Sequence, residues 1–148
     1  MTERDQIPPF LYVVVCAAGI AAGVGKLITA AQEREWHVGV IATPTAMNGF
    51  FDTAAVVVAP ATFNTINKWA AGIADTLAVG TLCEVVGRGV PVGVLTCVSD
   101  DLARHPAYQD SLIRLRGMGV RFGYPYQGAE GEEFEWERAL DLVEPQGR

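Results

Sequence analysis

Residues 55–77 have the sequence AVVVAPATFNTINKWAAGIADTL, and this stretch decides the fold of the chain. The β-branched run at 56–58 is typical of a buried strand, and Pro60 breaks it. Beyond the break, apolar residues recur at the spacing of one helix face, namely Ile66, Trp69, Ala70, Ile73 and Leu77. The stretch therefore predicts a strand at 55–59, a tight turn, and a helix at 66–77.

The predicted turn carries two hydroxyls and an amide, on Thr62, Asn64 and Thr65. In an open parallel sheet, ligands bind just beyond the carboxyl ends of the strands, where helix N-termini present free N–H groups to a phosphate. We therefore expect these three residues to belong to a cofactor site. An ordinary strand–helix loop with Thr62 or Asn64 as the helix cap explains the same spacing, so the spacing alone leaves both interpretations open.

Strand-like and helix-like segments alternate on both sides of this stretch. Further strands are predicted at 11–16, 36–42, 90–96 and 120–122, and further helices at 20–34, 102–118 and 130–143. Ser99 can cap the helix that follows it, and the last helix has Trp136, Ala139, Leu140 and Val143 on one face. The alternation predicts an α/β fold of the three-layer Rossmann or flavodoxin-like type, a parallel sheet with helices on both faces.

We expect one domain over residues 1–148, with a loose leader at 1–9 and a C-terminal helix and tail at 129–148. The connection at 45–54 is short, because a crossover between parallel strands needs about a dozen residues or more. Either this connection is truly minimal or a loop is missing from the sequence.

The composition limits the classes of function. Half of the residues are hydrophobic, 19% are charged, the net charge is −6, and the 11 basic residues are scattered, which argues against nucleic acid or an anionic membrane as partner. The N-terminus lacks the order of a signal peptide, and the apolar run at 11–22 is shorter than the about 20 residues that span a bilayer. We expect a cytoplasmic protein.

Neither a metal site nor a common nucleotide loop is predicted. Three cysteines without a CxxC spacing and two histidines form no zinc pattern and no disulfide framework. A phosphate-binding P-loop would need glycine in place of Ile20 and a hydroxyl in place of Leu27. The dinucleotide fingerprint also fails, because Ile28 stands where its third glycine belongs.

Residues 60–65, PATFNT, closely resemble the Pro-Ala-Ser-Ala-Asn-Thr motif of the flavin-containing cysteine decarboxylases. That family includes phosphopantothenoylcysteine decarboxylase and the lantibiotic-modifying decarboxylases. The resemblance continues through Lys68, residues 71–75 and Leu77, and residues 19–22 resemble the family's Gly-Ser-Ile-Ala-Ala turn. Residues 106–109 resemble its later Pro-Ala-x-Gln helix, so the similarity extends over roughly 10–125.

The resemblance implies a Rossmann-like subunit that binds FMN, with active sites at contacts between subunits of a homo-oligomer, a trimer or a multiple of trimers. It implies FMN contacts at Ala18, Gly19, Ile20, Thr43, Ala61, Thr62, Asn64 and Thr65. In the family the asparagine of the motif also touches the substrate carboxylate. Asn64 is therefore the candidate catalytic residue.

Two departures separate this chain from the family. The family's catalytic histidine lies between the second and third strands, and residues 45–54 contain no histidine. His37 is expected to be structural and His105 to lie on a solvated loop. The family's Pro-x-Met-Asn-x-x-Met-Trp substrate motif is also absent, since its aligned positions hold Thr96, Val98, Ser99, Leu102 and Ala103. Cys97 lies on the same loop, but no neighbour in the sequence would lower its pKa.

Three functions follow from the resemblance. The first is an FMN-dependent decarboxylase-like enzyme, a carbon–carbon lyase acting on a cysteinyl or related thiol, either a small molecule or a peptide. The second is a non-catalytic FMN-binding or regulatory subunit. The third is a flavin prenyltransferase-like enzyme, which shares the Gly-Ile-Ala-Asp helix but normally differs at the positions of Asn64 and Thr65.

Overall fold

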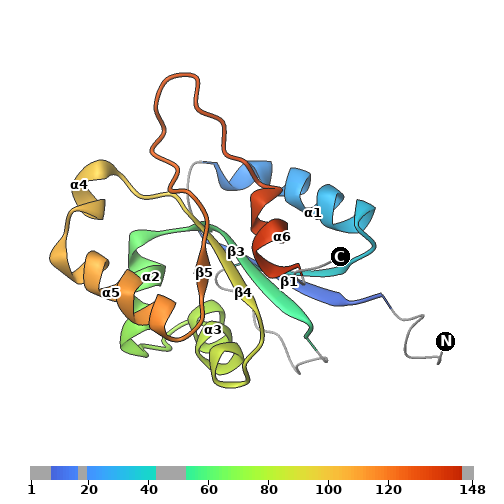
Figure 1. The fold of residues 1–148 in the computed structure, drawn as a ribbon, viewed down its shortest axis with the longest axis horizontal. Coiled ribbons are helices and arrows are strands. Elements are labelled where there is room, and N and C mark those ends of the chain that lie inside the picture. The colour runs from blue at the N-terminus through green and yellow to red at the C-terminus, as the bar shows by residue number, and fades with distance from the viewer. Residues whose placement is uncertain (1–7, 17–19, 43–52, 145–148) are drawn as a thin grey trace.

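The computed structural model of the chain describes residues 8–16, 20–42 and 53–144 and contains a five-stranded sheet in the order β2-β1-β3-β4-β5 (Figure 1). All neighbouring strands pair in parallel. The strands are β1 (Phe10–Val15), β2 (His37–Ala42), β3 (Ala55–Ala61), β4 (Val92–Thr96) and β5 (Arg121–Phe122). This strand order is that of a flavodoxin-like sheet, as the alternating sequence pattern predicted.

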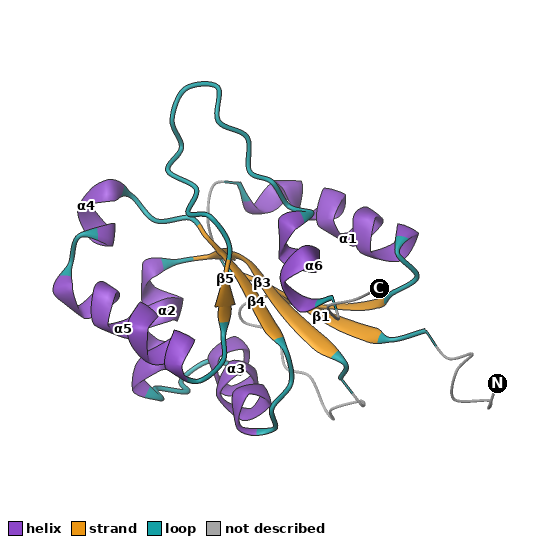
Figure 2. Cartoon of the chain, in the orientation of Figure 1, coloured by secondary structure: helices purple, strands orange, loops and turns teal. Residues whose placement is uncertain are grey.

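Helices cover both faces of the sheet (Figure 2). They are η2 (Ala21–Gly23), α1 (Val24–Glu33), α2 (Phe63–Ala71), α3 (Leu77–Gly87), α4 (Asp100–Ala103), α5 (Pro106–Gly117) and α6 (Arg138–Val143). One apolar cluster joins the sheet to α1 and α6, and a second joins it to α2, α3 and α5. The predicted three-layer arrangement is confirmed. None of the helices in the described parts of the chain has the length and apolar character needed to cross a bilayer.

β1 shows how the strands supply both layers. Leu11 and Val13 face the cluster of α1 and α6, whereas Tyr12 and Val14 face the cluster of α2, α3 and α5. Successive side chains of a strand point to opposite faces, so a continuous apolar run fills two cores at once.

The central strand β3 is longer than its predicted span of 55–59. It pairs with β1 on one side and β4 on the other, and all seven of its residues are buried. Pro60 cannot donate to the sheet, but its carbonyl oxygen accepts from the backbone N–H of Cys16 at 3.3 Å. The register shifts between Val58 and Ala61, and the strand continues to Ala61.

The prediction of one helix at 66–77 was wrong in its extent, because the chain forms two helices here. α2 begins earlier, at Phe63, and ends at Gly72, whose φ of 71° is left-handed. An ion pair of 2.6 Å between Lys68 and Asp75 holds the turn, and Thr76 caps α3. Ile73 continues the apolar spacing but is 51% exposed, so it does not belong to the core.

The helix predicted at 102–118 is also divided in two. Ser99 caps the short helix α4, as predicted, by accepting from the N–H of Leu102. Pro106 then opens α5, with His105 as its cap. Proline is favoured at the first position of a helix and disfavoured inside one, so it begins a new helix here.

The last helix is shorter than the predicted 130–143, because α6 begins only at Arg138. Trp136, Ala139, Leu140 and Val143 are nevertheless all buried, so the predicted apolar face is correct. The predicted leader at 1–9, the connection at 45–54 and the tail fall largely on residues 1–7, 43–52 and 145–148, which lie outside the described residues.

Gly93 provides a test of the packing of α6 on β4. A Cβ at this position would lie 2.8 Å from the Leu142 Cβ and 3.1 Å from the Ala139 carbonyl oxygen. We expect Gly93→Ala to lower the free energy of unfolding by about 1–3 kcal/mol, because the clash forces the helix away from the sheet. Urea unfolding followed by tryptophan fluorescence measures this change.

Gly25→Ala is the matched control, since a Cβ there would meet no atom within 4 Å. It should be neutral or stabilising by up to about 1 kcal/mol, the usual advantage of alanine over glycine in a helix. Equal stability of Gly93→Ala and the wild type would show that α6 does not pack closely on β4.

Candidate functional site

The predicted site lies where the order of strands in the sheet reverses. β1 lies between β2 and β3, so the chain leaves β1 toward one side of the sheet and returns on the other. The crevice outside the carboxyl ends of β1 and β3 is therefore the topological switch point at which such folds bind ligands. Cys16 follows β1 at this point, and Thr62 follows β3.

A short chain of hydrogen bonds joins the two strand ends. Thr62 caps α2, and its Oγ1 accepts from the backbone N–H of Thr65 at 3.3 Å. The Thr62 hydroxyl also donates to Thr65 Oγ1 at 3.2 Å. On the other side, the buried Cys16 thiol donates to the same Thr65 oxygen at 3.2 Å. Thr62 thus acts as the helix cap that the sequence allowed, and Cys16, which was predicted only as the last residue of the strand at 11–16, fixes Thr65.

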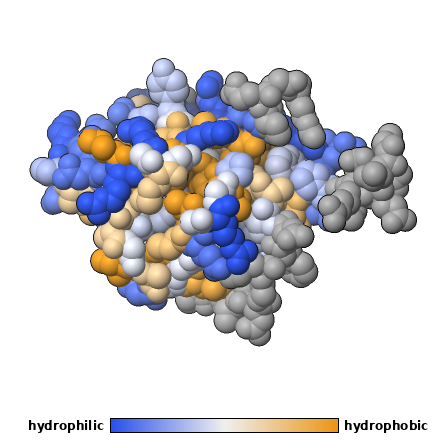
Figure 3. Space-filling view, turned by 60° about the horizontal axis from the view of Figure 1, so that its bottom comes forward, coloured by the Kyte–Doolittle hydropathy of each residue, from blue (hydrophilic) through white to orange (hydrophobic). Residues whose placement is uncertain are grey.

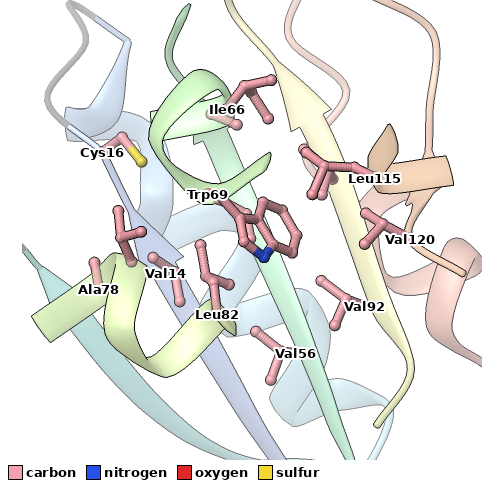
Figure 4. Close-up of a cluster of buried hydrophobic side chains, with 14 of the residues drawn as sticks. Val14, Cys16, Val56, Ile66, Trp69, Ala78, Leu82, Val92, Leu115 and Val120 are labelled. Atoms are coloured by element: carbon pink, nitrogen blue, oxygen red, sulfur yellow. The ribbon is translucent and has the colours of Figure 1, made fainter. Parts of the chain in front are cut away.

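Apolar side chains behind the turn hold α2 in place. Figure 4 shows Ile66 and Trp69 of α2 in the cluster that also contains Val14 of β1 and Cys16, which follows that strand. Ile66 is inaccessible to solvent, and Trp69 is 2% exposed. The first turn of α2 is therefore fixed relative to the ends of β1 and β3.

The first turn of α2 also presents free donors. The backbone N–H groups of Phe63 and Asn64 have no partner in the helix, as expected for its first positions, and none elsewhere among the described residues. The Asn64 side chain is exposed. The positive end of the helix dipole favours an anion at this place, so the residues fit a phosphorylated cofactor.

The predicted contacts on the other turns are placed in part. Ile20 is half-buried directly before η2, and its carbonyl oxygen accepts from the Gly23 N–H at 3.0 Å. Ala18, Gly19 and Thr43 lie outside the described residues. The structure therefore brings Ala61, Thr62, Asn64 and Thr65 together at the switch point, with Ile20 beyond the end of β1.

The loop after β4 lies next to this turn. The Cys97 N–H donates to the Ala61 carbonyl oxygen at 2.9 Å. A cavity of about 140 Å³ opens beside the loop, and Thr96, Val98 and Ala103, three of the positions where the family motif is absent, line it. Tyr108 of α5 lines the same cavity and stacks on Phe63 at 5.7 Å between ring centroids. The cavity therefore adjoins the first residue of α2.

Phe63 and Tyr108 were not predicted as site residues. Burial raises the pKa of the Tyr108 phenol, and a hydrogen bond with Thr96 partly offsets that rise. The one signal in the sequence was Phe63 itself, a large aromatic residue where the family motif has alanine.

Only one of the two histidines lies on the site side of the sheet. His37 begins β2, paired with Phe10 at the amino end of β1. The ring of His105 lies edge-on to Phe63 at 5.9 Å. Its Nδ1 accepts from the Ala107 N–H at 3.0 Å, so Nε2 is the ring nitrogen left to act on a ligand.

The Cys97 thiol is not set up as a nucleophile. Burial and the negative charge of Glu132 raise its pKa, which keeps the thiol protonated at neutral pH. This agrees with the sequence, which offered no group to activate it. Among the described residues, no three His, Cys, Asp or Glu side chains are grouped to hold a metal ion.

Two curated relatives match the sequence over part of its length. A cysteine/cysteine sulfinic acid decarboxylase from an unknown prokaryotic organism is 39% identical over 72 residues, which cover 49% of this chain and 19% of the relative. The coenzyme A biosynthesis bifunctional protein CoaBC of Thermococcus kodakarensis is 34% identical over 70 residues, 47% of this chain and 17% of the relative. The matches thus span less than a fifth of either relative.

Solved structures share the fold over almost the whole chain. The FMN-dependent cysteine decarboxylase SpaF superposes with a TM-score of 0.73 at 19% identity, covering 93% of this chain and 95% of that one. The peptidyl-cysteine decarboxylase EpiD gives the same TM-score of 0.73 at 19% identity, over 92% and 98%. AnUbiX in complex with FMN and dimethylallyl pyrophosphate gives 0.69 at 13% identity, over 92% of each chain.

The resemblance recognised at residues 60–65 is confirmed by these comparisons. A family model described as Flavoprotein matches residues 26–144, well over half of the 148 residues. It includes β3, the capped turn and the whole of α2. The chain therefore belongs to the flavoprotein family.

Proposed function

We propose that the chain binds FMN at the crevice between β1 and β3 and catalyses the oxidative decarboxylation of a cysteinyl or related thiol, as a carbon–carbon lyase. The observation that carries the proposal is the first turn of α2, which presents the free N–H groups of Phe63 and Asn64 at the switch point. Membership of the flavoprotein family and the cysteine decarboxylases among the similar proteins support it.

Several residues at the turn would each contact a different part of FMN. The N–H groups of Phe63 and Asn64 and the Thr65 hydroxyl would donate to its phosphate or polar edges. The Thr62 hydroxyl, which donates to Thr65 Oγ1 in the structure, would turn to donate to FMN when it binds. Ala61 would approach through its backbone, and Ala18, Gly19, Ile20 and Thr43 complete the proposed contacts. When bound, FMN would supply the two-electron oxidation of the thiol that accompanies loss of carbon dioxide.

Asn64 is the residue that we assign to the substrate. Its side chain is exposed at the crevice and has no partner among the described residues, so its amide N–H is free to donate to a carboxylate. Holding the carboxylate there would orient the bond to be broken relative to the cofactor.

The side of the site that would receive the substrate differs from the family pattern. The positions of the family's substrate motif hold Thr96, Val98 and Ala103, which line the cavity of about 140 Å³ together with Tyr108. The same wall includes the charged side chains of Asp100 and Arg116. A lining so different from the family motif supports a thiol substrate other than the one that motif binds, either a small molecule or a peptide.

The surface of α3 supports assembly into a homo-oligomer, a trimer or a multiple of trimers. Leu77, Cys83 and Val86 are only half-buried on this helix, and its charged residue Glu84 pairs at 2.8 Å with Arg88, which follows the helix. Figure 3 views the side of the molecule that carries α3, where apolar side chains interleave with polar ones. A helix that is apolar nearly all round is usually covered on every side.

A cytoplasmic location is part of the same proposal. Cys16, Cys83 and Cys97 are all free thiols in the structure. Unpaired cysteines suit a reducing compartment, in which disulfides rarely form.

A non-catalytic FMN-binding subunit is the second candidate. It is favoured by the absence of the family's substrate residues from the loop after β4 and by the absence of a histidine from residues 45–54. The likeness to AnUbiX keeps a flavin prenyltransferase-like enzyme as a further alternative. A prenylated flavin in protein grown with dimethylallyl phosphate would favour that alternative, and ordinary FMN would count against it.

Asn64→Asp separates the enzyme from the binding protein. A second carboxylate would repel the substrate carboxylate, so we expect turnover to fall by about 100-fold while FMN stays bound. The assay incubates FMN-loaded protein with cysteine-terminated peptides and small thiols, and mass spectrometry detects the loss of one carbon dioxide and two hydrogens.

Asn67→Asp is the control for this variant, because it makes the same chemical change one turn further along α2. Asn67 accepts from the Ser111 hydroxyl at 2.8 Å, and a carboxylate can accept the same bond. Its turnover should stay close to that of the wild type. If neither the wild type nor any variant turns over a thiol while FMN is bound, the non-catalytic subunit is the better assignment.

A pair of cap variants tests where FMN binds. Thr62 caps α2 at the switch point, and Thr76 caps α3 through the N–H of Val79. Thr62→Ala and Thr76→Ala should each lower the free energy of unfolding by about 1 kcal/mol. Only Thr62→Ala should also weaken FMN binding, by about tenfold, because it removes a donor to the cofactor.

The FMN affinities are read from the quenching of flavin fluorescence on binding, with unfolding measured on the same samples. If the two variants lose FMN affinity equally, then FMN binds elsewhere or the loss of affinity reflects only the lower stability of the variants. A purified protein without flavin absorbance and without affinity for added FMN would overturn the proposal as a whole.

A further inference from the structure

The segment between β5 and α6, residues 123–137, carries most of the net charge of the chain. We call it the acidic loop, because it contains five of the 17 acidic residues and none of the 11 basic ones. The remaining 12 acidic and 11 basic residues nearly cancel, although the whole chain has a net charge of −6. Figure 1 shows this loop projecting beyond the carboxyl edge of the sheet.

Internal contacts give the acidic loop a defined shape. The Glu132 carboxylate accepts from the backbone N–H groups of Gln127 at 3.1 Å and Ala129 at 3.0 Å. The Phe134 ring lies edge-on to both Tyr126, at 5.4 Å, and Trp136, at 4.6 Å. Trp136 is buried and packs against Gly23, at the start of α1. At the other end, the Gly123 N–H donates to the Val94 carbonyl oxygen at 3.0 Å, so the loop is anchored at both of its ends.

The acidic loop encloses the larger of the cavities described for this chain, with a volume of about 490 Å³. Its walls combine aromatic rings with carboxylates, from Tyr124, Tyr126, Phe134, Glu132, Glu133 and Glu135. Arg138 also lines it but pairs with Glu135. Glu133 has no hydrogen bond or ion pair among the described residues, so the lining keeps a net negative charge.

Aromatic faces and carboxylates together select cations. A ring attracts an ammonium or guanidinium group placed over its face, and a nearby carboxylate adds a direct charge interaction. The net negative charge of these walls disfavours an anion, and a purely apolar group would contact the rings but leave the carboxylates without a charge partner. Charge complementarity therefore points to a lysine or arginine side chain as the occupant.

The cavity lies within reach of the proposed FMN site. Tyr126 pairs with Cys97 in a parallel bridge, and the Cys97 N–H donates to the Ala61 carbonyl oxygen. Neighbouring strands are about 4.8 Å apart, which places Tyr126 about 10 Å from Ala61. An extended peptide covers about 3.3–3.6 Å per residue, so about three residues would bridge that distance.

We propose that the cavity of the acidic loop binds a lysine or arginine side chain of the substrate, about three residues before the reacting cysteine. The site recognises the substrate, while the chemistry stays at the turn of Thr62 and Asn64. The assignment of the bound molecule as substrate rests on the proposed function, whereas binding of the basic side chain does not require turnover.

The test measures binding of fluorescein-labelled peptides to FMN-loaded protein by fluorescence anisotropy. The peptides end in serine instead of cysteine, so that no reaction occurs, and carry one lysine at each of the six positions before it or norleucine in its place. We expect the peptide with lysine about three positions before the end to bind about fivefold more tightly than its norleucine counterpart. This advantage should disappear at about 1 M salt, where the Debye length is about 3 Å.

Variants of the acidic loop locate the binding site. Glu133→Gln and Tyr124→Ala should each reduce the preference for lysine by about two- to fivefold. Glu130→Gln is the matched control, because it removes one charge from the same loop at a residue that does not line the cavity. It should leave the preference unchanged.

Equal binding of lysine and norleucine peptides would overturn the proposal. An equal loss of the lysine preference in Glu130→Gln and Glu133→Gln would also overturn it, because it would indicate a general effect of charge and not a defined site. Absence of peptide binding would also overturn it. A lysine preference without turnover of the matching cysteine peptides would support the cation site and contradict the proposed function. Turnover of cysteine peptides without a lysine preference would support the proposed function and contradict the cation site.

Discussion

The structure depends on the burial of β3 on both faces and along both edges. Every residue of this strand is buried, and the strand is hydrogen-bonded to β1 and β4. A strand in this position must be apolar on both faces, which explains the run of small and β-branched residues at 55–61. Its carboxyl end is consequently the most firmly fixed place at which polar groups can leave the core, and the candidate site begins there.

Hydrogen bonds carry this rigidity from the core to the site. Thr65 is 8% exposed, yet its hydroxyl oxygen accepts from both Cys16 and Thr62. A buried hydroxyl without partners would cost about 1–3 kcal/mol, so these bonds strongly favour the observed arrangement of the two strand ends. The position of Thr65 is therefore tied to β1 as well as to β3. A cofactor in this crevice would meet groups that are already arranged before it binds.

The sequence predicted the parts of the structure that depend on local patterns. The run at 56–58, the cap at Ser99 and the buried face around Trp136 are all set by neighbouring residues. The break after α2 was missed because Ile73 and Leu77 continue the helical spacing, while the left-handed Gly72 ends the helix. The pairs Phe63–Tyr108 and Cys97–Tyr126 join residues far apart in the chain, so they depend on the tertiary fold and no local pattern indicates them.

The two sides of the candidate site differ in how they are built. The side assigned to the cofactor belongs to β1, β3 and α2, where a change in Cys16 or Thr65 would disturb the core itself. The side assigned to the substrate is built mainly from the loops after β4 and β5, which line the two cavities and contribute only single residues such as Val98 and Trp136 to the core. Loops of this kind tolerate substitution far better than the elements they connect. This division explains how the turn at 60–65 keeps its resemblance to the decarboxylases while the loop at 96–103 has lost the family's substrate residues.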